Sequence, residues 1–158
     1  MPVRDDRIES DEAQAALAAA LDRFDPAIRD GAAEAIERLR RLTPGADWMI
    51  YDNYAALVVG ASPSERPSDA ILSIVVYPRR YALYFLQGAG LADPDGLLEG
   101  QGAAGRSISL SHPSQMDDPP VAALIQRALA EAKVPIPAGR NGRLYVRSVS
   151  ARRRPRRP

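Results

Sequence analysis

The chain of 158 residues has no cysteine and a single histidine, His112. Without cysteine it can form no disulfide, no thiolate metal site and no cysteine nucleophile. One imidazole cannot build a poly-histidine metal centre, and any Ser-His-Asp relay would have to pass through it. No apolar run approaches the ~20 residues that span a bilayer, and the acidic first residues do not resemble a signal peptide. These absences favour a cytoplasmic protein without familiar catalysis.

Charge is distributed unevenly, although the formal net charge is only +1. Residues 140–158 contain eight arginines and no acid, whereas the first 139 residues hold 13 basic and 20 acidic groups, a net charge of −7. Length and composition fit one globular core. We therefore expect a flexible N-terminus at 1–9, a single domain at 10–149 and a disordered arginine-rich tail at 150–158.

Three segments place apolar residues at the three- and four-residue spacing of amphipathic helices. The first follows Ser10, a residue favoured at helix N-caps. The second begins at Asp25 and Pro26, and the third at Asp118 and Pro119, where a capping residue precedes a proline suited to the first helical turn. The sequence thus predicts two helices near the N-terminus and one near the C-terminus.

Between these helices the pattern changes to short β-rich runs separated by turn residues. The runs are Trp48–Tyr51, Ala55–Ala61, Ala70–Tyr77, Tyr81–Leu86 and Arg106–Ser111, with a short edge strand expected at Leu144–Val146. Consecutive strands joined by short turns are antiparallel, and Pro78-Arg79-Arg80 is typical of a tight hairpin. The predicted fold is α+β, a single antiparallel β-sheet meander with the N-terminal helices and the C-terminal helix packed on one face.

The string Gly100-Gln101-Gly102-Ala103-Ala104-Gly105 matches the dinucleotide fingerprint G-x-G-x-x-G letter for letter. That fingerprint requires a strand before the loop and a helix after it. Here a predicted strand follows the loop, so the context argues against nucleotide binding. Backbone N–H groups at Gly102 or Gly105 could still hold a small anion.

Arg106 shares a strand face with two apolar residues, Ile108 and Leu110, and is therefore expected to point toward the helices. A guanidinium in that position needs a partner. Two interpretations remain open at this point. Either a carboxylate such as Asp52 or a helix C-terminus satisfies Arg106, or the guanidinium holds an anionic ligand. The tyrosines expected to line such a ligand site are Tyr51, Tyr54, Tyr77 and Tyr84.

The remaining polar features have simpler interpretations. Asp93 and its neighbours lack the ligand spacing of a calcium loop and are typical of a turn with capping acids. His112 is interpreted as a surface turn histidine. Acids near the N-terminus could form a weak site for hard cations, although solvated disorder is favoured. These acids are Asp5, Asp6, Glu9, Asp11 and Glu12.

The tail carries enough charge for transient contact with nucleic acid, and it could equally fold back on the acidic body. Its arginines are Arg152, Arg153, Arg154, Arg156 and Arg157. No aromatic residue interrupts this run, so specific nucleic-acid recognition is not indicated by the tail alone.

From about Asp25 to Ala132 the order of elements resembles the bacterial YdhG-like domain family of unknown function. The resemblance is carried by the segments Leu39–Ala46, Ile71–Tyr77, Tyr81–Phe85 and Arg106–Ile108, and by the last helix. It implies an α+β domain with one antiparallel sheet and, for some members, a frataxin-like role as an intracellular iron carrier. The sequence departs from the family pattern at Asp52-Asn53-Tyr54-Ala55 and at Pro78-Arg79-Arg80.

Together these patterns predict a non-enzymatic binding domain for a small anionic molecule or a partner protein, with no cofactor. The expected ligand-binding residues are Arg106, Tyr84, Tyr51, Asp52, Gly102 and Gly105. The alternatives are iron carriage and weak nucleic-acid contact through the tail. An exposed strand at Leu144–Val146 could also pair with a second copy of the chain.

Overall fold

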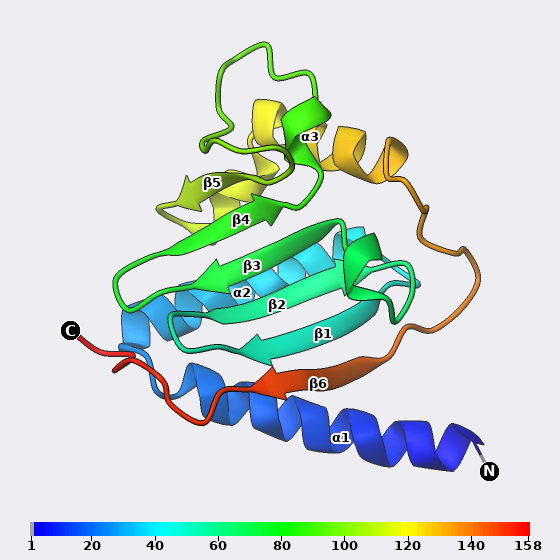
Figure 1. Cartoon of the computed structure of the whole chain (residues 1–158), viewed down its shortest axis with the longest axis vertical. Coiled ribbons are helices and arrows are strands. Elements are labelled where there is room, and N and C mark those ends of the chain that lie inside the picture. Colours follow the sequence, from blue (N-terminus) through cyan, green and yellow to red (C-terminus); the bar gives the residue numbers. More distant parts are fainter. Residues whose placement is uncertain (1) are drawn as a thin grey trace.

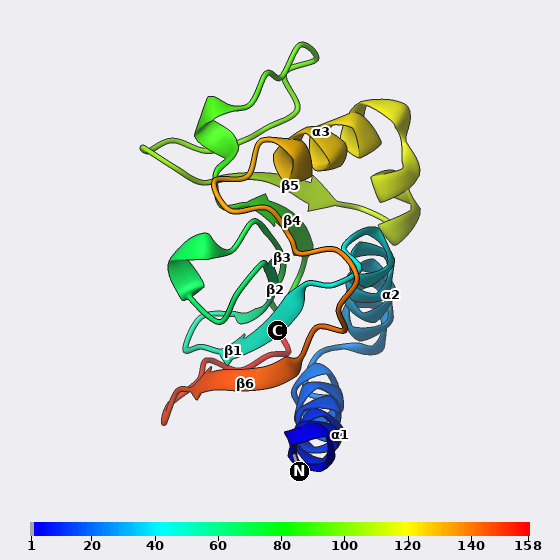
Figure 2. The same ribbon diagram turned by 90° about the vertical axis from the view of Figure 1, so that its right-hand side faces the viewer.

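A computed structural model describes the backbone of residues 2–158 and the side chains of residues 11–158. Three α-helices lie on one face of a six-stranded sheet (Figures 1 and 2). The helices are α1 (Pro2–Leu21), α2 (Pro26–Leu42) and α3 (Pro119–Ala130). The strands are β1 (Asp47–Asp52), β2 (Leu57–Ser62), β3 (Leu72–Val76), β4 (Tyr81–Phe85), β5 (Arg106–Leu110) and β6 (Leu144–Val149). The predicted α+β class is confirmed.

The sheet has the strand order β5-β4-β3-β2-β1-β6, and β1 to β5 form the predicted antiparallel meander. One detail differs, because β6 pairs with β1 in the parallel sense. The long connection through α3 and residues 131–143 returns the chain to the start of β1, and a parallel pair requires such a crossover. The C-terminal end of β6 therefore lies beside the C-terminal end of β1, where Val149 faces Asp52.

Alternation along the strands places the core between the sheet and the helices. Strands β1 to β4 turn every second residue toward the helices, and these residues are almost fully buried. On β3 and β4 they are Leu72, Ile74, Val76, Tyr81, Leu83 and Phe85. Helix α2 contributes Ala32, Ala35, Ile36 and Leu39, and α3 contributes Val121, Leu124, Ile125 and Ala128. One shared core thus fixes the positions of the turns between strands.

The helix boundaries follow the sequence signals to different degrees. Helix α2 begins at Pro26 directly after Asp25, as predicted, and α3 begins at Pro119 after Asp118, although neither aspartate side chain caps its helix. Helix α1 begins at Pro2 rather than after Ser10. The side chains of residues 1–10 lie outside the described residues. No described helix is both long enough and apolar enough to cross a membrane.

Several connections gather at one end of the sheet. Across the strands, Asp52 faces Leu57, Leu57 faces Val76, and Val76 faces Tyr81. The β1–β2 turn at 53–56 and the β3–β4 turn at 77–80 are consequently neighbours, and their centres are two strand spacings apart, about 10 Å. The C-terminal segment after β6 reaches this same end of the molecule (Figure 1).

Candidate functional site

The guanidinium of Arg106, the centre of the predicted site, is held by its own loop. Arg106 begins the edge strand β5, and its Nη1 donates to the carbonyl oxygens of Gly102 at 3.1 Å and Gly105 at 2.7 Å. The partner is therefore neither Asp52 nor a helix C-terminus, and that prediction is wrong. Glycine is required at 102, where φ is +110°. The loop carbonyls point at the guanidinium, so the loop holds Arg106.

The six predicted ligand-binding residues do not form one site. Tyr84 lies on the face of the sheet opposite Arg106, with its hydroxyl packed closely against Gly105. Tyr51 and Asp52 lie on β1, three strands away from β4. The Tyr51 hydroxyl lies 3.3 Å from the sulfur of Met49, on the face away from the helices. The sheet therefore separates these residues into an Arg106 group and a β1 group.

Asp52 is the centre of an ion-pair cluster that fixes the C-terminal tail. Its carboxylate is almost fully buried and pairs with Arg23 at 3.2 Å, Arg153 at 2.5 Å and Arg156 at 3.0 Å. Arg156 is only 4% exposed. Burial of a guanidinium requires such a partner, because desolvating an unpaired charge is costly. The tail was expected to be disordered, and the structure instead places it against the body.

Backbone contacts reinforce this docking. The N–H groups of Ser150 and Arg154 donate to the carbonyl oxygens of Asp52 and Tyr54, at 2.9 and 2.8 Å. Arg156 also donates to Asn53 and Tyr54. The tail therefore runs along the β1–β2 turn and ends near the junction of α1 and α2, as Figure 1 shows. Of the two predictions for the tail, folding back on the body describes this arrangement.

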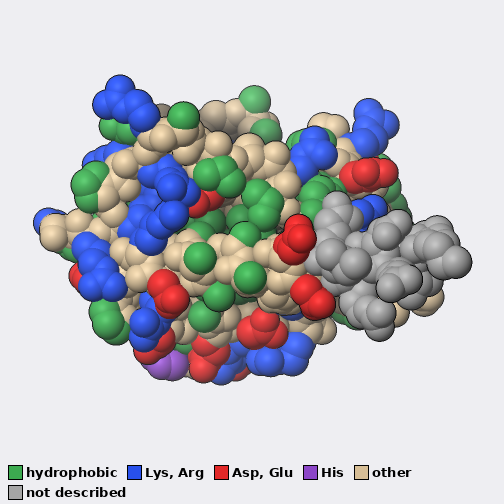
Figure 3. Space-filling model, turned by 90° about the horizontal axis from the view of Figure 1, so that it is seen from below, with side chains coloured by type: hydrophobic (Ala, Val, Ile, Leu, Met, Phe, Trp, Pro, Cys, Tyr) green, Lys and Arg blue, Asp and Glu red, His purple; other side chains and the backbone are tan. Residues whose placement is uncertain are grey.

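The docked tail and the β3–β4 turn together line a pocket of about 510 Å³. Its lining consists of four arginines, three prolines and one tyrosine, with Arg79, Arg80 and Tyr77 from the turn and Arg154 and Arg157 from the tail. We call it the arginine pocket. No acid is among these lining residues. In Figure 3 several Lys and Arg side chains lie on the left-hand side of the view, the side on which the C-terminus lies in Figure 1, and others lie on the right-hand side.

Two of the four arginines are held in place by other groups. The Arg80 guanidinium lies 4.3 Å from the centre of the Tyr77 ring and donates to Ser109 Oγ at 3.2 Å. Arg157 donates to the carbonyl oxygens of Arg23 and Asp22 and lies 3.9 Å from the Asp25 carboxylate. These contacts orient the two guanidinium groups and leave further N–H donors on each.

The other two arginines have no such partners. Among the side chains of residues 11–158, none forms a hydrogen bond or an ion pair with the guanidinium of Arg79 or Arg154. Guanidinium groups match phosphate and carboxylate oxygens in bidentate geometry. The arginine pocket thus offers two free and two pre-oriented cations to an anion.

Sequence reasoning missed the combination of the hairpin with the tail. Pro78-Arg79-Arg80 was predicted to be a hairpin, and the tail arginines were noted separately. The crossover to a parallel β6 joins them, because it delivers the tail to the end of the sheet where the hairpin lies, and no sequence pattern predicted that parallel pairing. Tyr77 was named as a possible site tyrosine, but beside Arg106 rather than Arg80.

The other sequence features have structural roles. Strand β5 follows the Gly100–Gly105 loop, which is the wrong context for a dinucleotide fingerprint. Asp93 accepts from the backbone N–H groups of Leu97 and Leu98, as expected of a capping turn. His112 is exposed, and its Nδ1 accepts from the N–H of Ser114.

No metal site is formed by the residues described. Within 11–158, no group of three or more His, Asp or Glu side chains could hold a metal ion. The side chains of Asp5, Asp6 and Glu9, three of the N-terminal acids considered above as a weak cation site, lie outside the described residues.

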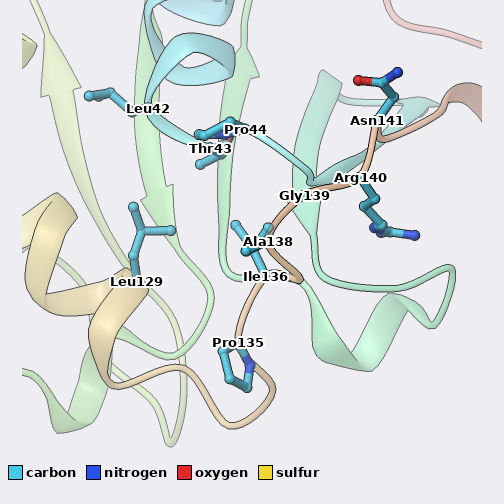
Figure 4. Close-up of a pocket in the computed structure, with 10 residues that line it drawn as sticks. All are labelled: Leu42, Thr43, Pro44, Leu129, Pro135, Ile136, Ala138, Gly139, Arg140 and Asn141. Atoms are coloured by element: carbon cyan, nitrogen blue, oxygen red, sulfur yellow. The ribbon is translucent and has the colours of Figure 1, made fainter.

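Another cavity, of about 580 Å³, lies between the C-terminal ends of α2 and α3 and the segment 135–141 (Figure 4). Its walls are mainly apolar, with Leu42, Leu129 and Ile136 among them. The one cation, Arg140, donates to the carbonyl oxygens of Gly45 and Pro63 and pairs with Asp47. Arg140 therefore fastens the crossover segment and is not free to orient a ligand in the cavity.

Comparisons of the chain with protein-family models, with curated proteins and with solved structures find no match. The resemblance to YdhG-like domains accordingly stays a prediction. The functional argument rests on the arginine pocket itself.

Proposed function

We propose that this chain is a cytoplasmic, non-enzymatic binding domain that holds phosphate-bearing anions in the arginine pocket. The observation that carries the proposal is the convergence of four arginines from two distant segments in one pocket without an acidic lining residue. The pocket volume lies within the range typical of small-molecule sites. The proposal keeps the predicted ligand class and moves the site from Arg106 to the other end of the strands.

Binding rather than turnover is favoured by the chemistry of the lining. Catalysis by proton transfer requires a group that titrates near the operating pH. The lining holds arginine, proline and tyrosine only, and arginine stays protonated at all relevant pH values. An anion held there would be oriented and partly desolvated, and Tyr77 is the one lining side chain with a group able to act as a base or nucleophile. For iron carriage, no observation in the described residues adds support.

The test is isothermal titration calorimetry with inorganic tripolyphosphate as the probe. We expect saturable binding at low salt that weakens about tenfold or more in the double variant Arg79→Gln, Arg154→Gln, since each lost charge-assisted contact contributes roughly 1 kcal/mol. The matched control is Arg41→Gln, Arg66→Gln, which removes two exposed arginines that line none of this pocket. Equal weakening in both double variants, or no saturable binding by the wild type, would overturn the proposal.

A further inference from the structure

An exposed aromatic side chain lies beside the docked tail. Tyr54, in the β1–β2 turn, is 53% exposed and is the most exposed aromatic residue described in the chain. Its own backbone carbonyl accepts from Arg154 N–H and from Arg156 Nη1. The turn is therefore anchored by two arginines of the tail, while the ring is left open to solvent. A large exposed ring on an anchored turn is a suitable platform for stacking.

The register of the sheet places the turn that carries Tyr54 near the arginine pocket. Asp52 and Leu57 flank the Tyr54 turn, while Val76 and Tyr81 flank the Arg79 turn, and all four lie in one row across the strands. The two turns are about 10 Å apart from centre to centre. The tail connects them, because Arg154 bonds to Tyr54 through its backbone and lines the pocket with its side chain.

We infer that this end of the sheet binds single-stranded nucleic acid, with the phosphates in the arginine pocket and a base stacked on Tyr54. The inference rests on the proposed anion site and specifies its ligand. A sequence-tolerant single-strand site combines a cationic track for the backbone with aromatic faces for the bases. The arginine pocket and the Tyr54 ring supply these two features on a folded scaffold, whereas the tail sequence by itself has no aromatic residue.

Other anionic polymers fit the same surface less well. A nucleic-acid duplex keeps its bases stacked inside, and this end of the sheet presents short turns rather than a helix or ribbon that could enter a groove. An acidic peptide would use the arginines but would gain little from an exposed tyrosine. The nearby carboxylates do not repel a strand strongly, since Asp52 is matched by three arginines and Asp25 lies beside Arg157.

Fluorescence anisotropy with a labelled oligothymidylate of about twelve nucleotides tests the inference in the full chain. The comparison ligands are an abasic strand of equal length, inorganic tripolyphosphate and a glutamate-rich peptide. We expect Tyr54→Ala to weaken oligothymidylate binding about tenfold, a typical loss for one stacked base, and to leave tripolyphosphate binding unchanged. Tyr54→Phe keeps the ring and should bind like the wild type. Tyr84→Ala is the matched control, because Tyr84 is exposed near the end of β4 that lies beside Arg106, opposite the end that carries the pocket.

The outcomes separate this inference from the proposed function. If Tyr54→Ala binds oligothymidylate like the wild type while Arg79→Gln does not, the anion site stands and the single-strand inference fails. If tripolyphosphate does not bind, both fail. Tighter binding of the glutamate-rich peptide than of oligothymidylate would also overturn the inference. Thermal unfolding of Tyr54→Phe and Tyr54→Ala checks that both variants are folded.

Discussion

Within residues 11–158, one buried side-chain polar atom lacks a hydrogen-bond partner, and it is the hydroxyl oxygen of Tyr145 on β6. An unpartnered buried hydroxyl destabilises a fold by about 1–3 kcal/mol. We therefore expect Tyr145→Phe to raise the free energy of unfolding by about 1 kcal/mol, measured by urea denaturation. Tyr51→Phe is the control, since the Tyr51 hydroxyl has a sulfur partner in Met49 and its loss should bring no gain. A clear loss of stability in Tyr145→Phe would contradict the expectation.

The same phenol makes a pH-dependent contribution. Burial raises the pKa of Tyr145, and the Asp47 carboxylate raises it further. The folded state then retains the phenolic proton more tightly than the unfolded state, so stability is unaffected at neutral pH. It falls as pH rises past about 10, where the unfolded tyrosine ionises first. Urea titrations at increasing alkaline pH should show a steeper decline for the wild type than for Tyr145→Phe.

At the residue scale, the face of a strand on which a residue lies could be predicted, but the groups that its side chain contacts could not. Alternation correctly placed Arg106 on the helix-facing side of its strand. Its partners are carbonyl oxygens of its own loop, and carbonyl direction depends on backbone angles that residue types do not determine. Asp52 was expected beside Arg106 and lies instead beside arginines more than a hundred residues later in the sequence. Such long-range pairs have no local sequence signal.

At the scale of elements, the Asp52 cluster fastens the tail. Asp52→Ala removes the carboxylate shared by Arg23, Arg153 and Arg156. Loss of one partner from a buried ion pair costs about 3 kcal/mol or more, and the buried Arg156 can avoid that cost by leaving with the tail. We therefore expect a lower free energy of unfolding and faster tryptic cleavage within 152–157. The control, Asp30→Ala, removes an exposed carboxylate of the Arg29 pair and should change neither.

An unchanged rate of tail cleavage in Asp52→Ala would mean that backbone contacts alone hold the segment. In that case the hydrogen bonds from Ser150 and Arg154 would be the principal restraint. The two outcomes are distinguishable because tryptic sites within the tail are separated in mass from those in the body.

Elements with strong local signals were predicted well. Apolar periodicity and the Asp25-Pro26 start defined α2, and short alternating runs with turn residues between them defined the antiparallel meander. Ser10 was a misleading signal for the start of α1, because no glycine or proline interrupts residues 3–21 and the helix extends back to Pro2. The tail gave a misleading signal, since arginine and proline are typical of disorder and its docking depends on charges supplied by other elements.

At the scale of the whole molecule, charge is separated between an acidic body and a basic C-terminal segment. The docked tail neutralises acids near α1, while the pocket arginines stay available to an external anion. The body as a whole repels a polyanion at long range, so approach is favourable only at this end and depends on screening. Charge would then orient the protein on a nucleic-acid strand, and the arginine pocket would make the first contact.

This separation predicts the salt dependence of binding. If the four pocket arginines each neutralise one phosphate of a single strand, the logarithm of the binding constant should fall with the logarithm of salt concentration at a slope of about −3. Arg79→Gln should make the slope shallower by about 0.7. Tyr54→Ala should lower affinity at every salt concentration and leave the slope unchanged, because stacking releases no counterions. Anisotropy titrations between about 50 and 200 mM NaCl measure both effects. A slope near zero, or one that Arg79→Gln leaves unaltered, contradicts phosphate contact by the pocket.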